Sequence, residues 1–310
     1  MIPLLLILTA LVMIVLPGII GQPLRLRAAE WARAAAASLF VGFVGLELAL
    51  VLLALPTVLR TLDAAGFASI CDHFLAPLTP GGPVLGWASL AAATVLAVRM
   101  LLAVWRGRRL ARSAEVEPWL GHHEDRGDFE LVVLPTPELL AVSVPGAAPQ
   151  VVVSEGLVHQ LDPHELDVVL RHEETHLRCK HWRYSMLGTA VERALWPLPL
   201  VARSSRALRS ALEAWADEEA AGDSASRRAS VRSAMLTLAN RGGTPRRHAS
   251  GCVLGERARR LTRPPLATSM GARAIVLAPM LVLGLTAVLL LADWTAGARH
   301  AVATAGYCLD

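Results

Sequence analysis

The chain has 310 residues, of which 54% are hydrophobic, and its mean hydropathy is +0.46. This composition is too apolar for an ordinary soluble domain and indicates a protein of the lipid bilayer. The net charge of +4 comes almost wholly from arginine, since Lys180 is the only lysine, and no stacking aromatic residues accompany the arginines. We therefore expect no direct nucleic-acid partner.

Four segments are long and apolar enough to cross a bilayer, which takes roughly 17–25 mostly apolar residues in a helix. They are residues 2–20, 35–59, 84–105 and 274–292. The first segment lacks the basic start and the small-residue cleavage site of a signal peptide, so we interpret it as a membrane span too. The sequence thus predicts four transmembrane helices.

The distribution of arginine predicts how these helices are oriented. Arginines occur in residues 21–34 and directly after residue 105, whereas residues 61–83 contain no lysine or arginine. Because basic loops remain on the cytoplasmic side, we expect residues 106–273 to be cytoplasmic and both termini, including a short tail at 293–310, to be outside. The preference for arginine over lysine is typical of GC-rich bacteria, so the expected location is a bacterial plasma membrane.

Some polar residues and thiols call for separate interpretations. Glu47 and Arg99 lie inside predicted spans, where charged side chains are costly. Glu47 is either a signal-transmitting or helix-pairing residue within reach of Arg99, or a protonated acid hydrogen-bonded between helices. Cys71 and Cys308 fall on the expected outer, oxidising side and are candidates for a disulfide, whereas we interpret Cys179 as a thiol packed between helices.

Short extended runs follow the third span. They occupy residues 129–134, 140–144 and 150–154 and are separated by proline and glycine turns. These runs predict a small sheet, and its edge strand could bind an extended peptide through main-chain hydrogen bonds. A purely structural sheet would show the same pattern.

The motif HExxH occurs at residues 172–176, within VVLRHEETHLRCKHW. A capping box at residues 162–165 predicts that a helix begins just before it. On a helix, His172 and His176 are stacked neighbours that can bind one metal ion, while Glu173 projects beside it. A Zn²⁺ held by three protein ligands keeps one position for water, and a carboxylate is needed to take that water's proton. The alternative interpretation is a polar helix face exposed to solvent.

A second helix is predicted at residues 204–222, with a serine cap and with Gly222 at its end. Its EAWAD sequence places Glu213 and Asp217 four residues apart on one face. Glu213 can complete a zinc site of two histidines and one glutamate, and Asp217 can orient a ligand histidine through its second ring nitrogen. Acidic helix residues usually face solvent, so this prediction depends on the HExxH helix that precedes it.

Three stretches together resemble the BlaR/MecR antirepressor family of integral membrane zinc metallopeptidases: AVSVPGAAPQVVVSEGL, LDPHELDVVLRHEETHLRCKHW and EAWAD. The resemblance implies a mainly α membrane protein in which a cytoplasmic α+β gluzincin domain is inserted between the third and fourth transmembrane helices. It implies one Zn²⁺ per chain, with the ligands His172, His176 and Glu213. Glu173 would be the general base, and Asp217 would orient a ligand histidine by binding its second ring nitrogen. It also implies proteolysis, with a cytoplasmic protein such as a winged-helix transcriptional repressor as the substrate.

The chain departs from the β-lactam receptors of that family after the fourth predicted span. Those receptors carry a large penicillin-binding sensor domain there, whereas this sequence has only a short tail without an SxxK motif. We therefore expect sensing to depend on a separate protein or on the loop at residues 61–83.

Other functions are compatible with part of the pattern. A housekeeping membrane protease of the prenyl-protein or heat-shock type shares HExxH with a later ExxxD, although the topology favours the antirepressor family. A non-catalytic membrane receptor could carry zinc structurally, but it would have no use for Glu173. We interpret residues 225–272 as a connector back to the membrane with one short helical run near 229–240, and no self-cleavage site is marked in it.

Overall fold

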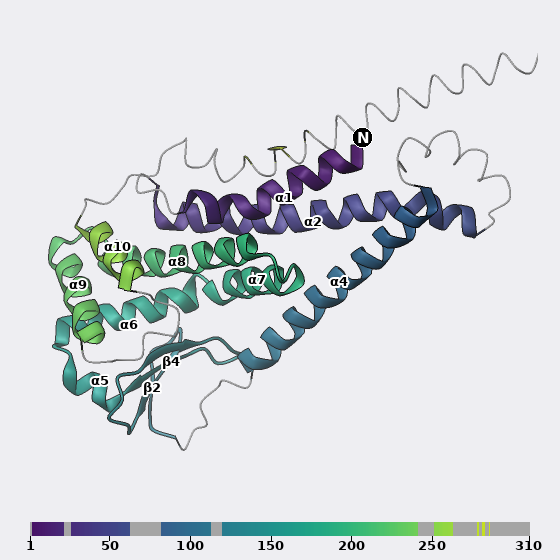
Figure 1. Ribbon diagram of the computed structural model, residues 1–310. Helices are drawn as coiled ribbons and strands as arrows, with labels where there is room; N and C mark the ends of the chain where they lie inside the picture. Colours follow the sequence, from purple (N-terminus) through teal and green to yellow (C-terminus); the bar gives the residue numbers. More distant parts are fainter. Residues whose placement is uncertain are drawn as a thin grey trace, which may run out of the picture.

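The computed structural model is mainly helical, with a small sheet at one end (Figure 1). It describes residues 2–21, 26–62, 82–112, 120–240 and 251–262, and positions 278, 281, 282 and 285. The long N-terminal helices are α1 (Ile2–Ile20), α2 (Ala28–Thr61) and α4 (Gly82–Arg112). The strands are β1 (His122–Asp125), β2 (Glu130–Leu134), β3 (Ala141–Val144) and β4 (Gln150–Ser154). The remaining helices are α5 (Glu155–Gln160), α6 (Pro163–Arg178), α7 (His181–Ala194), α8 (Pro199–Ala221), α9 (Ala225–Asn240) and α10 (Gly251–Leu261).

Helices α1, α2 and α4 are each long and apolar enough to cross a membrane. They contain the first three predicted spans, which are confirmed to this extent. The fourth predicted span, at 274–292, lies outside the described residues except at a few positions, and so do Cys71 and Cys308. The fourth span, the orientation and the disulfide therefore stay predictions.

Small residues allow the long helices to approach each other closely, as is usual in membrane bundles. A side chain at Gly42 of α2 would collide with Ile14 of α1, and nearby the Ser38 hydroxyl donates a hydrogen bond of 2.7 Å to the carbonyl oxygen of Met13. A side chain at Gly86 of α4 would likewise collide with Thr57 near the other end of α2. Helix α2 therefore packs against α1 along its first half and against α4 toward its end.

A contact of Glu47 with Arg99, which belonged to one of the two interpretations of Glu47, is not seen in the described part of the chain. The Arg99 guanidinium instead donates a hydrogen bond of 3.2 Å from Nη1 to the carbonyl oxygen of Trp196, in the loop between α7 and α8. The Oε1 atom of Glu47 is buried without a hydrogen-bond partner. The sequence could not reveal this arrangement, because the loop that receives Arg99 comes from a segment not predicted to lie beside the spans.

The sheet has the order β1-β2-β4-β3, in which β2 and β4 are parallel and the other two pairs are antiparallel. Strands β2, β3 and β4 correspond to the three predicted runs. Strand β1, with the sequence HHED, was not predicted because it lacks an apolar alternation. The valine run of β4 is buried throughout, as expected for a central strand, and β3 forms one edge of the sheet.

Helix α6 begins with the predicted capping box. The Asp162 side chain accepts hydrogen bonds from the backbone N–H groups of His164 and Glu165, and the Glu165 side chain accepts one from the N–H of Asp162. Such a cap satisfies donors that would otherwise be unpaired at the helix start. The start of the HExxH helix is therefore encoded locally.

The predicted start of the next site helix is wrong. Helix α8 begins at Pro199 rather than after a serine cap near Ser204, and it ends before Gly222 as predicted. Proline suits the first turn of a helix, so it extends α8 to an earlier start. Ser204 and Ser205 are fully buried inside the helix, and the Ser204 hydroxyl makes tertiary contacts instead of a cap.

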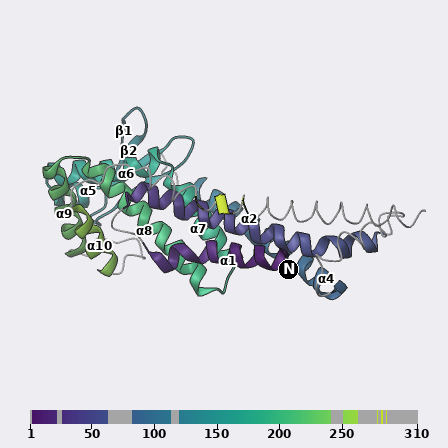
Figure 2. The same ribbon diagram turned by 90° about the horizontal axis from the view of Figure 1, so that it is seen from above.

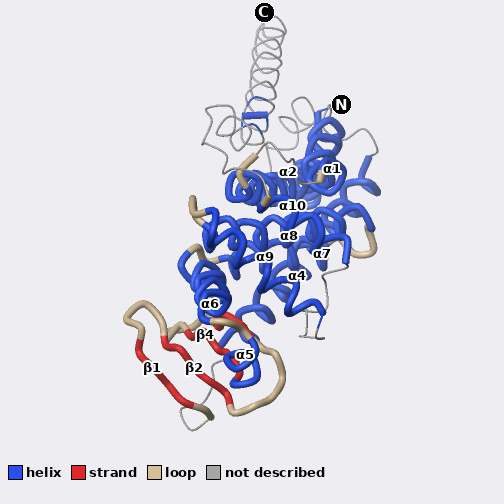
Figure 3. Tube along the Cα trace, turned by 90° about the vertical axis from the view of Figure 1, so that its left-hand side faces the viewer, coloured by secondary structure: helices blue, strands red, loops and turns tan. Residues whose placement is uncertain are grey.

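Helices α7 and α8 form a hairpin, in which α8 packs against α1 and α2 and α7 packs against α2 and α4 (Figure 2). One apolar core joins α1, α2, α7 and α8, and it includes Ile14, Leu39, Val191, Leu208 and Leu212. Seen end-on, the sheet, α6, α8 and the pair α1 and α2 follow one another as layers (Figure 3). Helix α8 is therefore enclosed between the candidate membrane helices and the HExxH helix.

The region interpreted as a connector contains two packed helices, so that interpretation is incomplete. Helix α9 packs against α6 and α8, and Val231 and Ala234 share a buried cluster with Val168. Helix α10 packs against α8 and α9, and its last residue, Leu261, joins the same cluster. Both helices therefore pack with the helices that carry the HExxH and ExxxD motifs.

We predict that Gly18→Ala destabilises the protein by about 1–3 kcal/mol, the usual cost of overpacking. A Cβ atom at Gly18 would lie 2.7 Å from the backbone nitrogen of Ser204, so α1 and α8 would have to separate. Gly255→Ala is the matched control, because that helical glycine faces open space and alanine favours a helix. Unfolding of the detergent-solubilised protein measures both effects. Equal stability of the two variants would contradict the close packing of α1 against α8.

Candidate metal centre

Helix α6 presents the two histidines of HExxH on one face. The Nε2 atoms of His172 and His176 are 3.1 Å apart, and the ring centroids are 4.8 Å apart. The helix produces this proximity because residues four apart are stacked on the same side. Two imidazole nitrogens at this separation can bind one shared cation.

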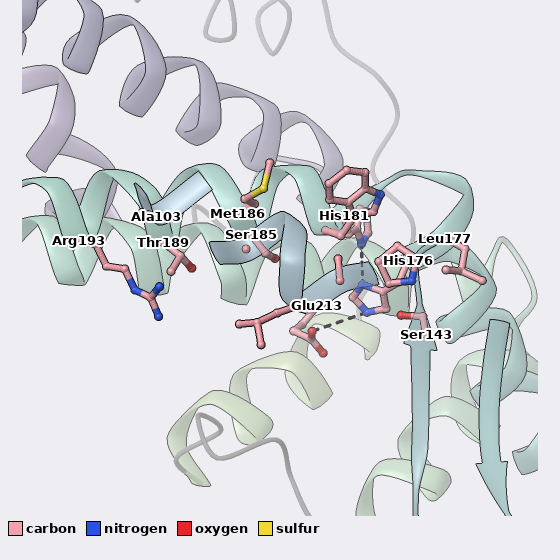
Figure 4. Close-up of a pocket in the computed structure, with 15 residues that line it drawn as sticks. Ala103, Ser143, His176, Leu177, His181, Ser185, Met186, Thr189, Arg193 and Glu213 are labelled. Carbon is pink, nitrogen blue, oxygen red and sulfur yellow. Dashed lines mark hydrogen bonds and ion pairs between the residues drawn. The ribbon is translucent and has the colours of Figure 1, made fainter. Parts of the chain in front are cut away.

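Helix α8 brings Glu213 to the same point (Figure 4). The Oε2 atom of Glu213 is 3.6 Å from Nε2 of His172, and its Oε1 atom is 3.6 Å from Nε2 of His176. The ligand atoms of the three residues all lie within 4.8 Å of one another. The structure therefore brings together the ligand set predicted from sequence, and two histidines with one glutamate form a known type of catalytic zinc site.

Each of the two histidines has a second contact at its other ring nitrogen. Nδ1 of His172 is 3.0 Å from Oδ1 of Asp217, as the ExxxD spacing predicted. Nδ1 of His176 is 3.0 Å from Nδ1 of His181, a contact that was not predicted. Contacts of this kind fix the ring orientation and leave Nε2 available to a metal. His181 is itself buried and packs against Trp215, with ring centroids 4.6 Å apart.

Glu173 lies beside these residues on α6. It is buried, and its Oε2 atom has no hydrogen-bond partner. An unpartnered carboxylate oxygen is costly to bury. A water molecule held by a metal at His172, His176 and Glu213 would provide that partner, so the residues present fit a metal ion.

Arg257 is a site residue that the sequence did not reveal. From α10 it donates two hydrogen bonds to Asp217, from Nε at 2.7 Å and from Nη2 at 2.8 Å, and its Nη1 atom is 3.4 Å from Oε2 of Glu213. The fork geometry of a guanidinium suits such bidentate pairing. The arginine-rich ERARRL stretch was the only signal, and nothing in it distinguished Arg257 from its neighbours.

The pKa values reflect this concentration of charge. Burial lowers the pKa of His172, but its hydrogen bonds with Asp217 and Glu213 outweigh burial and raise the pKa to about 10. Burial raises the pKa of Asp217, but the charge of Arg257 outweighs this effect and lowers it. Burial and the neighbouring His176 lower the pKa of His181 to about 3, so that ring is neutral at pH 7. A metal must therefore displace a proton from His172 in order to bind.

A divalent ion balances the charges of the site when His172 and His176 are neutral. Glu173, Glu213 and Asp217 carry three negative charges when ionised, and Arg257 supplies one positive charge. A divalent cation at the two histidines and Glu213 would bring the sum to zero. Because unbalanced buried charge is expensive, the donor set and its surroundings both suit a divalent metal.

A cavity of about 330 Å³ adjoins the ligands. His176, His181 and Glu213 line it on the metal side, and Gly107 of α4 and Met186 of α7 line it elsewhere. Ser143 of the edge strand β3 also borders it (Figure 4). The cavity is thus shared by the sheet, the site helices and the end of a candidate membrane helix.

An HExxH helix completed by a glutamate from a later helix, in a chain with candidate membrane helices, is the arrangement of a membrane metallopeptidase. Residues 131–263 match the family model described as BlaR1 peptidase M56, which runs from β2 through α10. Over these residues the chain is similar to the M56 peptidase family, which confirms the resemblance seen in the sequence. The family implies a metal ion, usually zinc. No curated protein and no solved structure matches the chain significantly.

We predict that Arg257→Ala costs about 3–5 kcal/mol of stability in the presence of a chelator, the usual effect of breaking a buried ion pair. Zinc should restore part of this loss, because the ion supplies positive charge to the same acids. Arg259→Ala, which removes an exposed arginine of the same helix, should change little. Unfolding measured with chelator and with zinc tests this, and an equal loss in both conditions would show that Arg257 is not coupled to the metal site.

Proposed function

We propose that the protein is an integral membrane zinc endopeptidase that cleaves a cytoplasmic protein. The observation that supports this most directly is the convergence of His172, His176 and Glu213 beside Glu173, whose Oε2 atom is buried and unpartnered. A structural zinc site would have a fourth protein ligand and no use for a free carboxylate. Within the described residues the candidate cluster has three ligands, which suits catalysis.

Each residue of the site has a separate role in the proposed peptide hydrolysis. Zinc, held by His172, His176 and Glu213, would supply the Lewis acidity that activates water and polarises the scissile carbonyl. Glu173 takes a proton from the attacking water and returns it to the leaving amine. Asp217 and His181 hold the ligand rings in place, and Arg257 keeps Asp217 ionised and oriented.

The edge strand β3 offers a place for the substrate backbone. Among the described strands β3 pairs with β4 alone, and Ser143 on it borders the cavity beside the metal ligands. An extended peptide that pairs with the other edge would run past the site, with its main chain held by hydrogen bonds. The adjoining cavity would receive a substrate side chain.

A signal-responsive role, with a winged-helix repressor as the substrate, is the most specific form of this proposal. It is supported by the family model, whose description names BlaR1, and by the expected cytoplasmic position of the domain. The housekeeping protease alternative has no comparable support. Cleavage of a candidate repressor in membranes that contain the protein is the direct test of the substrate.

We predict that Glu173→Gln retains zinc and loses proteolysis by about 10²–10⁴-fold, the usual contribution of a general base. The amide keeps the shape of the side chain but cannot accept the proton of the attacking water. Glu174→Gln, one residue along the same helix and less buried, is the control and should remain active. Zinc content and cleavage rate are measured on the same membranes; unaltered turnover in Glu173→Gln would refute the proposed role.

We also predict that Gly107→Leu makes the enzyme prefer substrates with a smaller side chain in the cavity. The ratio of kcat/KM for small and large side chains should change by about 10–100-fold, as expected when a pocket loses space for a few methylene groups. A Cβ atom at Gly107 would already lie 3.2 Å from Cγ of Met186, which also lines the cavity. Gly107→Ala should give a smaller shift, since Met186 is flexible. Digestion of a peptide mixture, followed by mass spectrometry of the cut sites, provides the measurement.

A further inference from the structure

The segment between α7 and α8 exposes large apolar side chains at the end of α7 opposite His181. Trp196 is 71% exposed, Leu198 47% and Leu200 41%. The rest of the hairpin is well packed, and its Val191, Leu195 and Val201 belong to the core shared with α1 and α2. We infer that residues 195–200, which form this loop and the first residues of α8, are inserted into the bilayer and that lipid acyl chains cover the exposed side chains of Trp196, Leu198 and Leu200.

The contacts of the loop with a candidate membrane helix support this position. Arg99 of α4 donates a hydrogen bond of 3.2 Å to the carbonyl oxygen of Trp196. Arg99 lies six residues before the end of the apolar segment at residue 105, which corresponds to about 9 Å along the helix. In hydrocarbon, both an arginine side chain and a loop carbonyl need a partner. Each provides the partner that the other lacks.

Contacts with α1 independently indicate how deep the loop lies in the bilayer. The Ser204 hydroxyl accepts a hydrogen bond of 3.0 Å from the N–H of Gly18 and lies 3.2 Å from the carbonyl oxygen of Val15. Gly18 is two residues from the end of α1, so Ser204 is near that end of the span. The loop comes before Ser204 on α8 and extends beyond it alongside α1 (Figure 2).

The charged residues at the start of α8 agree with this depth. Arg203 and Arg206 are exposed and flank Ser204, close to the end of α1, whereas the loop itself carries no charged residue. Arginines at the level of the lipid headgroups and apolar side chains beyond them form the usual pattern of a membrane interface. The exposed Leu101 and Trp105 of α4 would meet the same lipids.

This insertion would set the distance between the metal site and the membrane. Helix α7 leads from His181, which lines the cavity, to the loop in 14 residues, which is about 21 Å. The site is therefore held close to the membrane surface, and peptide segments near that surface are the ones it can reach. The insertion itself depends on the membrane helices and not on the proposed peptidase mechanism.

Spin labels on the full-length chain test the position of the loop. Cys71, Cys179, Cys252 and Cys308 are replaced by serine, and single cysteines are introduced as Leu198→Cys, Leu101→Cys or Leu120→Cys. All three positions are exposed; Leu101 lies within a candidate membrane helix and Leu120 beside strand β1. After reconstitution into vesicles of phosphatidylcholine and phosphatidylglycerol, collision rates with oxygen and with a water-soluble nickel complex are measured for each label.

We expect the ratio of oxygen to nickel collisions at position 198 to match position 101 and to exceed position 120 several-fold. A ratio like that of position 120 would place the loop in water and overturn the inference. Low collision rates with both reagents would also overturn it, since protein would then cover the loop, either residues 274–292 or a second copy of the chain.

Trp196→Phe provides a second measurement that introduces no cysteine. Brominated phosphatidylcholine should quench Trp196, so the share of fluorescence that is quenched should fall in the variant relative to the unsubstituted chain. An unchanged share would show that lipid does not contact Trp196 and would overturn the inference. Zinc binding and proteolysis are assayed separately, so failure of the peptidase proposal would be distinguishable.

Discussion

The burial of α8 between two partners is the constraint on which the rest of the structure depends. One side of this helix, including Leu208 and Leu212, packs into the core formed with α1 and α2. Its acidic residues Glu213 and Asp217 meet the histidine side chains of α6. Because both faces are occupied, α8 cannot move along either partner without losing apolar contacts or the metal ligand geometry. The spans and the metal centre therefore share one rigid element.

Placing acids on such an enclosed helix is costly, and the fold compensates each one separately. Asp217 is bound by His172 and by the fork of Arg257, and Glu218 accepts hydrogen bonds from Arg260 and from the N–H of Ala28 at the start of α2. Arg257 and Arg260 are three residues apart on α10, so one helix serves both acids. The same helix thus stabilises the metal centre and the junction between α8 and the second candidate membrane helix.

A continuous series of side chains connects α2 with the ligand histidines. The Arg33 guanidinium lies 4.6 Å from the centre of the Trp215 ring, Trp215 packs on His181, and His181 contacts His176. Together with Gly107 of α4 at the cavity, this series means that two candidate membrane helices contribute to the surroundings of the site. The candidate membrane helices and the region that matches the peptidase family are consequently one packed unit, in which the candidate metal ligands are supported by residues that pack against those helices.

The sequence by itself determined the features that depend on local spacing. HExxH on a capped helix, the ExxxD spacing of Glu213 and Asp217, the valine run of β4 and three apolar spans are all encoded within short windows, where helical and strand periodicity apply directly. Only the tertiary structure decided which distant segments contact one another. Arg257, the contact of His181 with His176, the early start of α8 and the pairing of Arg99 with Trp196 depend on which helices pack against one another. Spacing within a segment carries no information on that choice, because it is made by burial and charge compensation between segments.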